Sequence, residues 1–267
     1  MPTHESQEND SGGVRSVQRA IEIMSLLTEQ RPRVTIRDIV ETTGLPKTTV
    51  LRIVQTLEHS GLLAATPSGY VAGPGLWRWA HLAKHSWEPT EAARAVMREL
   101  VARQRETVNI YILHNLSRVC VTQEESPMAL RHVVRVGDEL PLWAGASSKV
   151  LLRDAPRDFL ERIVHTAPGG LAHLPNLEKE IANAAADGYG ISYDEREVGL
   201  SAVAVPIHGR EGEVVAALSY SGPTSRFPDE RMPELIADLR WGAARLTEQG
   251  FDHPLRSPLH RREGHRS

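Results

Sequence analysis

Two segments near the N-terminus carry apolar side chains at the spacing of one helix face. In the first, Ser16 is a candidate N-cap, and apolar residues recur at helical spacing over 17–27. The second begins at Thr35, has Asp38 in the capping-box position, and stops at Gly44. Both patterns predict short amphipathic helices with one face buried.

A third helix and a hairpin follow directly. The pattern predicts a helix over 46–60, with Pro46 suited to a first helical position and Gly61 ending it. Strands are expected at 62–65 and 70–72, joined by a turn at 66–69. Three helices and a small hairpin in this order predict a winged helix-turn-helix, because the apolar stripes can only be buried against one another.

Beyond this unit the chain mixes helical and strand patterns. Helices are predicted at 76–86, 91–106, from about residue 147, and at 156–165, 177–187 and 229–249. Strands are predicted at 108–114, 118–123, 130–136, 190–193, 202–208 and 214–220. This mixture is typical of an α+β domain built on an antiparallel sheet, and it suits a sensor domain.

The fold class is therefore α+β, with an N-terminal winged helix-turn-helix joined by linker helices to an antiparallel-sheet domain. We expect five parts: a disordered tail at 1–13, the helix-turn-helix at 14–75, a linker or dimerisation helix at 76–88, the sheet domain at 89–250, and a flexible tail at 251–267.

Composition restricts the class of protein without naming one. No apolar run is long enough to span a membrane, and the polar start of the chain is not a secretory signal, so a cytoplasmic protein is expected. The single cysteine, Cys120, excludes a disulfide framework and fits a buried strand position. Net charge is −3, yet residues 14–75 hold seven Lys and Arg against five Asp and Glu. The more basic N-terminal part is compatible with binding DNA at that end.

The third helix carries the chemistry for reading DNA. Its apolar residues cluster on one side, and polar side chains cluster on the other. Arg can pair with guanine, Gln with adenine, and Thr with a base or a phosphate. The candidate DNA contacts are Lys47, Thr48, Thr49, Arg52, Gln55 and His59 on this helix, Ser68 in the hairpin turn, and Arg33 and Arg15 as phosphate contacts.

Residues 14–75 resemble the N-terminal domain of the IclR family of transcription regulators. The matching stretches are 16–20 (SVQRA), 44–57 (GLPKTTVLRIVQTL), 61–63 (GLL) and 69–74 (GYVAGP); the resemblance continues at 136–142 (VGDELPL), 187–190 (DGYG), 204–207 (AVPI) and 219–223 (SYSGP). The resemblance implies a homodimer or tetramer, a double-stranded DNA operator with inverted half-sites, and a GAF-like C-terminal domain. That domain would bind a small organic effector, an acid or an aromatic metabolite.

The resemblance also indicates where the effector pocket lies, between the sheet and several loops. These segments supply hydroxyl groups and an apolar wall, and the amides near Ser147 and Ser148 suit a carboxylate. Asp194 and Glu195 would oppose an anion, although each can accept from a ligand hydroxyl or amine. The candidate effector contacts are Trp143, Ser147, Ser148, Ser192, Asp194, Glu195, Ser201, Ala202, Ser219 and Ser221.

Two other classes of protein are alternatives. The first is an enzyme with a catalytic serine, yet the run 145–149 (GASSK) completes neither of the serine motifs G-x-S-x-G and S-x-x-K. The histidines also lack the spacing of metal ligands. No enzymatic activity, cofactor or metal is therefore expected. A DNA-binding protein without a ligand is the second alternative, in which residues 76–250 serve only oligomerisation through the Trp-rich helix.

Overall fold

The chain forms two compact units, residues 1–86 and 87–267. The computed structural model describes residues 14–28, 30–87, 89–251 and 253–255. The tail expected at 1–13 and most of the tail expected at 251–267 lie outside these residues. The boundary between the units falls at the end of helix α4, Gly75–Trp87.

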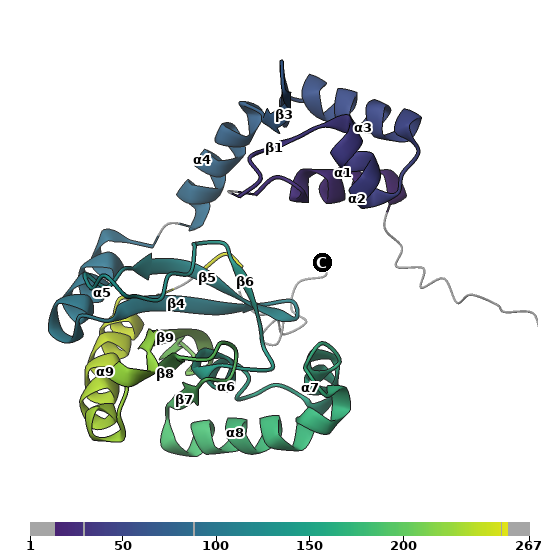
Figure 1. The fold of residues 1–267 in the computed structure, drawn as a ribbon. Coiled ribbons are helices and arrows are strands. Elements are labelled where there is room, and N and C mark those ends of the chain that lie inside the picture. The colour runs from purple at the N-terminus through teal and green to yellow at the C-terminus, as the bar shows by residue number, and fades with distance from the viewer. Residues whose placement is uncertain (1–13, 29, 88, 252, 256–267) are drawn as a thin grey trace, which may run out of the picture. The chain divides into compact units, whose positions relative to one another are not determined.

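The N-terminal unit packs three helices around one apolar core (Figure 1). They are α1, Arg15–Ser25; α2, Ile36–Thr43; and α3, Lys47–His59. Burial of an aliphatic side chain stabilises the fold by about 1.5–3 kcal/mol, so this core is a main contribution to holding the three helices together. Its buried members are Ile23, Val34, Ile39, Val50, Val54, Leu57 and Leu63.

The ends of α2 follow from local chemistry, as predicted. Thr35 Oγ1 accepts a hydrogen bond from the Asp38 amide at 3.2 Å, and Asp38 Oδ2 accepts from the Thr35 amide at 2.8 Å. Gly44 then ends the helix at φ +67°. The prediction that Ser16 is the N-cap of α1 is wrong, because Val14 holds that position and no side chain caps the helix. The helix starts earlier than Ser16 since its apolar face, not a cap, decides where it forms.

The hairpin is part of a three-stranded sheet. The predicted strands are β2, Leu63–Thr66, and β3, Gly69–Ala72. A further strand that the pattern did not predict, β1 (Arg33–Val34), pairs with β3, which gives the order β1-β3-β2. A Cβ atom at Gly69 would lie 2.7 Å from the Val34 carbonyl oxygen. Glycine is therefore required where the two strands meet.

The C-terminal unit is built on a six-stranded antiparallel sheet with the order β6-β5-β4-β9-β8-β7. Its strands are β4, Thr107–His114; β5, Ser117–Glu124; β6, Glu139–Pro141; β7, Gly190–Tyr193; β8, Leu200–His208; and β9, Val214–Pro223. The α+β class, with a winged helix-turn-helix and an antiparallel sheet, is confirmed.

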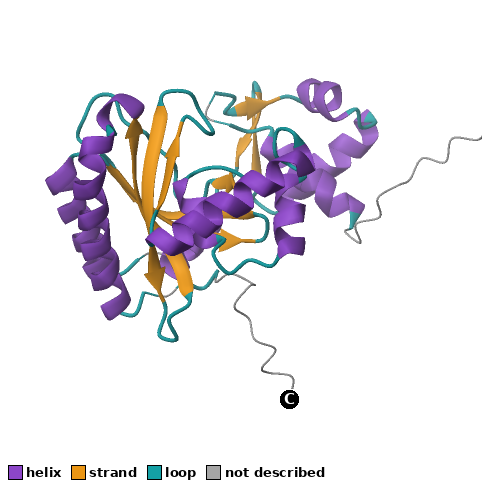
Figure 2. Ribbon diagram, turned by 90° about the horizontal axis from the view of Figure 1, so that it is seen from below, coloured by secondary structure: helices purple, strands orange, loops and turns teal. Residues whose placement is uncertain are grey.

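Helices cover both faces of this sheet (Figures 1 and 2). One face packs against α5, Glu91–Gln104, and α9, Met232–Glu248. The other packs against α6, Ala146–Leu151; α7, Arg157–Val164; and α8, Leu174–Asp187. Short 3-10 helices lie at Gly170–His173, Thr224–Arg226 and Asp229–Arg231. Burial on both sides explains why the central strands carry long apolar runs.

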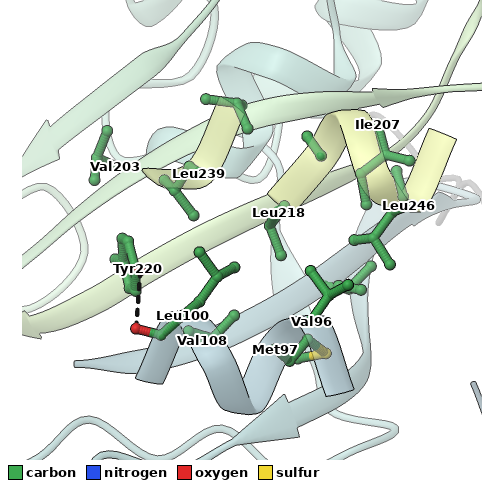
Figure 3. Close-up of a cluster of buried hydrophobic side chains, with 14 of the residues drawn as sticks. Val96, Met97, Leu100, Val108, Val203, Ile207, Leu218, Tyr220, Leu239 and Leu246 are labelled. Carbon is green, nitrogen blue, oxygen red and sulfur yellow. Dashed lines mark hydrogen bonds between the residues drawn. The ribbon is translucent and has the colours of Figure 1, made fainter. Parts of the chain in front are cut away.

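The strand β4 shows how the two cores divide. Ile110 and Ile112 belong to the cluster shared with α5 and α9, whereas Tyr111 and Leu113 belong to the cluster shared with α6 to α8. Figure 3 shows the first cluster, in which the Tyr220 hydroxyl donates to the Leu100 carbonyl oxygen at 3.1 Å. Successive side chains point to opposite faces of a strand, so one strand supplies both cores.

The strand predicted at 130–136 is wrong. Residues 131–135 have no regular structure. The strand that pairs with β5 on the side away from β4 is instead β6, which begins three residues after the predicted strand. The Val134 amide donates to Gln123 Oε1 at 2.7 Å, and the His132 carbonyl oxygen accepts from Thr107 Oγ1 at 2.8 Å. Because side chains satisfy these backbone groups, the segment does not need a strand neighbour.

Candidate functional site

The third helix presents a polar face to solvent. Val50, Val54 and Leu57 are buried, while Ile53 is partly buried against them. The opposite side exposes Lys47, Thr48, Arg52, Gln55 and His59, and Thr49 is half-buried. Within the described ranges, the Arg52 side chain has no hydrogen-bond or ion-pair partner in the fold. Its five N–H donors are therefore available to an external acceptor.

The hairpin brings two further candidates together. Arg33 Nη1 donates to Ser68 Oγ at 2.7 Å, and both side chains are exposed. Arg33 reaches the hairpin turn because β1 is paired with β3. Arg15, the remaining cationic candidate, is the first residue of α1 and is exposed. A positively charged side chain at a hairpin tip suits contact with a phosphate.

An open groove runs between α1 and α3 in the same unit. Its volume is about 1250 Å³. Val17 and Ile21 contribute apolar side chains that are 55% and 61% exposed. The polar side chains of Arg52, Gln55 and His59 also line the groove. The N-terminal unit therefore carries an uncovered apolar surface beside its polar face.

The C-terminal unit holds a small cavity on the side of the sheet that faces α6. Its volume is about 40 Å³. Strands, the start of α6 and two loops contribute to it. The lining residues are Tyr111, Arg118, His132, Leu140, Gly145, Ala146, Ser147, Ser192, Glu195, Arg196, Leu200, Ala202, Ser219 and Ser221.

Charged side chains form part of the wall of this cavity. The Arg118 side chain is buried, and Nη1 donates to the Ala144 carbonyl oxygen at 2.6 Å and to Ser148 Oγ at 2.5 Å. Burial lowers the pKa of its guanidinium to about 10, so it keeps its charge at neutral pH. Glu195 pairs with Lys149 Nζ at 2.5 Å and accepts from the Gly145 amide at 2.7 Å.

Two more basic side chains complete the cavity wall. Arg196 Nη2 lies 3.1 Å from His132 Nε2, and His132 Nδ1 lies 2.9 Å from Ser221 Oγ. Burial, with a smaller effect from the Arg196 charge, lowers the pKa of His132 to about 4. His132 is therefore neutral at physiological pH.

The structure gathers some of the predicted effector contacts and separates others. Those that line the cavity are Ser147, Ser192, Glu195, Ala202, Ser219 and Ser221. Trp143, Ser148, Asp194 and Ser201 are not among the lining residues. Asp194 Oδ1 accepts from the Gly199 amide, and Ser201 donates to Thr224, so both are used within the fold. Of the amides expected to suit a carboxylate, that of Ser148 donates to the Gly145 carbonyl oxygen at 3.0 Å, and the neighbouring Gly145 amide donates to Glu195 Oε2 at 2.7 Å.

Comparison with known proteins identifies both units. Residues 16–67 match the IclR helix-turn-helix domain, and residues 82–247 match the bacterial transcriptional regulator IclR C-terminal domain. The chain belongs to the IclR family. It is thus a DNA-binding transcription regulator of the IclR type, and its relatives are regulators rather than enzymes.

The matches to IclR-family members extend over most of the chain. The transcriptional regulator KdgR of Escherichia coli is 31% identical over 256 residues, which cover 91% of this chain and 95% of KdgR. KipR of Bacillus subtilis is 27% identical over 88% of this chain and 96% of its own. A solved structure of an IclR-family regulator from Rhodococcus sp. is 37% identical, with a TM-score of 0.61, covering 93% of this chain and 98% of that one.

A second solved structure shares the fold and holds a ligand. It is an IclR homologue from Microbacterium hydrocarbonoxydans complexed with 4-hydroxybenzoate, 23% identical with a TM-score of 0.70, covering 87% of this chain and 98% of that one. In the described part of this IclR-family chain, no helix is long and apolar enough to cross a membrane. The same residues contain no cluster of three His, Cys, Asp or Glu side chains fit to hold a metal ion.

The sequence patterns did not single out the basic residues of the cavity. Arg118, His132 and Arg196 come from β5, an irregular segment and the loop after β7, and only the folded chain brings them together. One signal was available for Arg118. It shares a strand face with Cys120, a buried residue, so an inward-facing arginine was implied by the alternation.

Proposed function

We propose that this IclR-family protein binds a double-stranded DNA operator as a homodimer, and that a small organic effector in the C-terminal cavity changes its affinity for the operator. The observation that carries the proposal is the exposed polar face of α3, in a unit that matches the family's DNA-binding domain. Because such a regulator acts on chromosomal DNA, we place it in the cytoplasm.

The roles of the α3 side chains follow from their chemistry. Arg52 and Gln55 have the donor patterns that pair with guanine and adenine in the major groove, and Thr48 can contact a base or a phosphate. Other side chains are expected to contact DNA bases or the phosphates of the DNA backbone. They are Lys47, Thr49 and His59 on α3, Arg33 and Ser68 near the hairpin turn, and Arg15.

The homodimer is supported by apolar side chains left uncovered in the N-terminal unit. Val17 and Ile21 on α1 are more than half exposed, and on α4 Trp77 and Trp79 are 81% and 59% exposed. Several large apolar side chains exposed in one unit favour a protein interface. A dimer would present two copies of α3 to successive major grooves, so we expect half-sites one or two turns apart.

The effector role is supported by the cavity and by a relative. The cavity brings the hydroxyl groups of several serines and the guanidinium groups of Arg118 and Arg196 to one enclosed place, where they can form hydrogen bonds with a small ligand. The Microbacterium homologue is a complex with 4-hydroxybenzoate, which supports ligand binding within this fold. A ligand changes DNA affinity only if it binds the DNA-competent and incompetent states unequally. AllR of Klebsiella pneumoniae, which is 29% identical, is named as a repressor, so we expect effector binding to relieve repression.

The test is a fluorescence-anisotropy titration of the purified protein against duplexes from the DNA flanking its own gene, at fixed salt, with a scrambled duplex as the control. We expect one region to bind at least about 1,000-fold more tightly than the scrambled duplex. Addition of the correct organic molecule should shift that affinity. Equal binding to all duplexes would refute the operator. A specific operator whose affinity responds to no ligand would leave a DNA-binding scaffold, the alternative considered above.

Oligomeric state is measured separately by light scattering during size-exclusion chromatography. The wild-type protein should elute as a dimer or a multiple of one. A double variant, Val17→Asp with Ile21→Asp, should dissociate and lose operator affinity. A monomeric wild-type protein with full operator affinity would contradict the dimer.

A further inference from the structure

The segment 126–134 is held in place by side chains rather than by a neighbouring strand. It leads from β5 toward β6 and has no helix or strand of its own. Thr107 Oγ1 accepts a hydrogen bond from the Ser126 amide at 3.2 Å and donates to the His132 carbonyl oxygen at 2.8 Å. One hydroxyl group, at the start of β4, therefore holds the segment at two points.

The outer side of the 126–134 segment adds little to the core of the C-terminal unit. Met128, Leu130 and Val133 are 36%, 69% and 48% exposed, whereas Val134 is buried. Regions with few buried apolar contacts open at a lower free energy than the core does. The segment can therefore leave its place at a lower cost than the strands of the sheet.

The same segment forms part of the cavity wall. His132 is among the lining residues, and its Nδ1 atom lies 2.9 Å from Ser221 Oγ. Its other ring nitrogen, Nε2, lies 3.1 Å from Arg196 Nη2. A molecule that takes the hydrogen bond of Ser221 competes with His132 for it. The position of the segment is therefore sensitive to what the cavity contains.

The segment is also attached to the C-terminal end of α5. Ser126 Oγ donates to the Arg105 carbonyl oxygen at 2.5 Å. Arg105 is the C-cap of α5 and has φ +58°, a left-handed backbone conformation that residues other than glycine rarely adopt. Such a conformation persists only where neighbouring contacts hold it. The hydrogen bond from Ser126 is one of these contacts.

A buried charge cluster extends this attachment. The side chain of Glu106, which follows the C-cap, is 2% exposed and accepts from Arg226 at 2.8 Å and 2.7 Å. Arg226 also donates to the Leu130 carbonyl oxygen at 2.9 Å. Arg231 donates to Glu106 at 2.9 Å and to the carbonyl oxygen of Gln104, the last residue of α5, at 2.7 Å. Because a buried carboxylate depends on its partners, movement at Leu130 disturbs the charges that fix the end of α5.

We propose that the 126–134 segment is a conformational switch that couples the cavity to α5. In the docked state that the structure shows, His132 stays at Ser221 and the end of α5 is held. A molecule that binds at Ser221 displaces His132, the segment detaches, and the end of α5 loosens.

This switch specifies how the cavity acts on DNA binding, so the inference rests on the proposed function. In the chain, α5 is the helix that follows α4, the last helix of the DNA-binding unit. Detachment removes a restraint near the point where the chain enters the C-terminal unit. A less restrained protein loses more conformational entropy when it binds the operator, so its affinity for the operator falls.

Thr107→Val and Thr122→Val form a matched pair of variants. Both side chains are buried on neighbouring strands of the sheet, and both substitutions replace a hydroxyl group by a methyl group. The Thr107 hydroxyl holds the segment, whereas the Thr122 hydroxyl has no hydrogen-bond partner within the part of the chain that the structure describes. Only Thr107→Val should release the segment, and Thr107→Ser, which keeps the hydroxyl, should not.

Hydrogen–deuterium exchange of the full chain, read by mass spectrometry, measures this release. In Thr107→Val, peptides from 126–134 and from the end of α5 should both exchange about 5-fold faster than in the wild type, the factor that one hydrogen bond supplies. Thr107→Ser and Thr122→Val should exchange like the wild type. An unchanged rate in 126–134, or faster exchange there with an unchanged rate in α5, would overturn the coupling.

A substitution at the cavity end tests whether the effect reaches α5 from a distance. His132→Phe removes the contact with Ser221 and should raise both exchange rates by the same factor, about 5-fold, because one opening exposes both peptides. His173→Phe is the matched control. His173 is a half-buried histidine of the same unit that contacts the Trp143 carbonyl oxygen and lies outside the cavity lining. Equal effects of the two histidine variants on α5 would overturn the proposal.

Operator titrations separate this inference from the proposed function. Thr107→Val should bind the operator about 5-fold more weakly than the wild type, while Thr107→Ser and Thr122→Val should bind like it. Operator affinity that is unchanged in Thr107→Val would overturn the regulatory role. If no duplex contained a specific operator, the proposed function would fail, whereas the exchange rates would still decide whether the segment and α5 open together.

Discussion

Replacement of Arg118 by methionine is expected to stabilise the C-terminal unit. Burial lowers the pKa of the Arg118 guanidinium from 12.5 to about 10. At neutral pH, the positive charge of Arg118 therefore costs the folded state about 3 kcal/mol relative to the unfolded state. Methionine has a similar length and adapts to irregular space, so the substitution removes the charge with little change in packing.

The hydrogen bonds lost with the guanidinium offset part of this gain. Arg118 donates to the Ala144 carbonyl oxygen and to Ser148 Oγ. Both acceptors stay paired without it, because Ser148 Oγ donates to the same carbonyl at 2.9 Å. Loss of these bonds costs about 1–2 kcal/mol, which leaves a net gain of about 1–2 kcal/mol in the free energy of unfolding.

Urea titration followed by circular dichroism measures this free energy. Because the pKa of Arg118 lies above neutral pH in both the folded and unfolded states, the gain should be constant between about pH 6 and about pH 8. Arg226→Met is the matched control, since Arg226 pairs with Glu106, whose side chain is 2% exposed. Because Arg231 still pairs with Glu106 at 2.9 Å, that variant should lose about 2 kcal/mol, less than the cost of an unpaired buried carboxylate. A loss of stability in Arg118→Met comparable to that of the control would refute the reasoning.

Three further predictions concern the fold. Thr35→Ala removes the capping-box acceptor for Asp38 and should lower the melting temperature of the N-terminal unit, through a loss of about 1 kcal/mol, in calorimetry. Tyr220→Phe removes the buried hydrogen bond to Leu100 and should cost about 1 kcal/mol in urea titration. For His132, the pKa falls from 6.5 to about 4 on folding, so the unfolded state binds the proton more readily. Stability should therefore decline as pH falls from about 6.5 to about 4, and His132→Gln should flatten this decline; an unchanged slope would contradict it.

The N-terminal unit was largely predictable because its signals are local. Capping, helix-ending glycines and helical periodicity act within a few residues, so the sequence indicated α2 and α3 closely. The strand β1 was missed because two residues, Arg33 and Val34, are too short to show alternation. Only its pairing with β3 defines it.

The cavity was less predictable because its members meet through long-range contacts. The hydroxyl groups of Ser219 and Ser221 were expected there by family resemblance, and they line it. His132 lies in a segment expected to be a strand, where side-chain hydrogen bonds to the backbone replace strand pairing. That irregular path carries the imidazole to Ser221, and no local pattern indicates it.

The most direct test of the account compares Arg52→Ala with Arg210→Ala on the operator. Both arginines are exposed, but Arg210 belongs to the C-terminal unit and not to α3. Anisotropy titrations at fixed salt should show that Arg52→Ala weakens operator binding by about 1–3 kcal/mol while its affinity for a scrambled duplex changes little. Arg210→Ala should bind like the wild type. Operator affinity unchanged by Arg52→Ala would contradict the assignment of α3 as the reading helix.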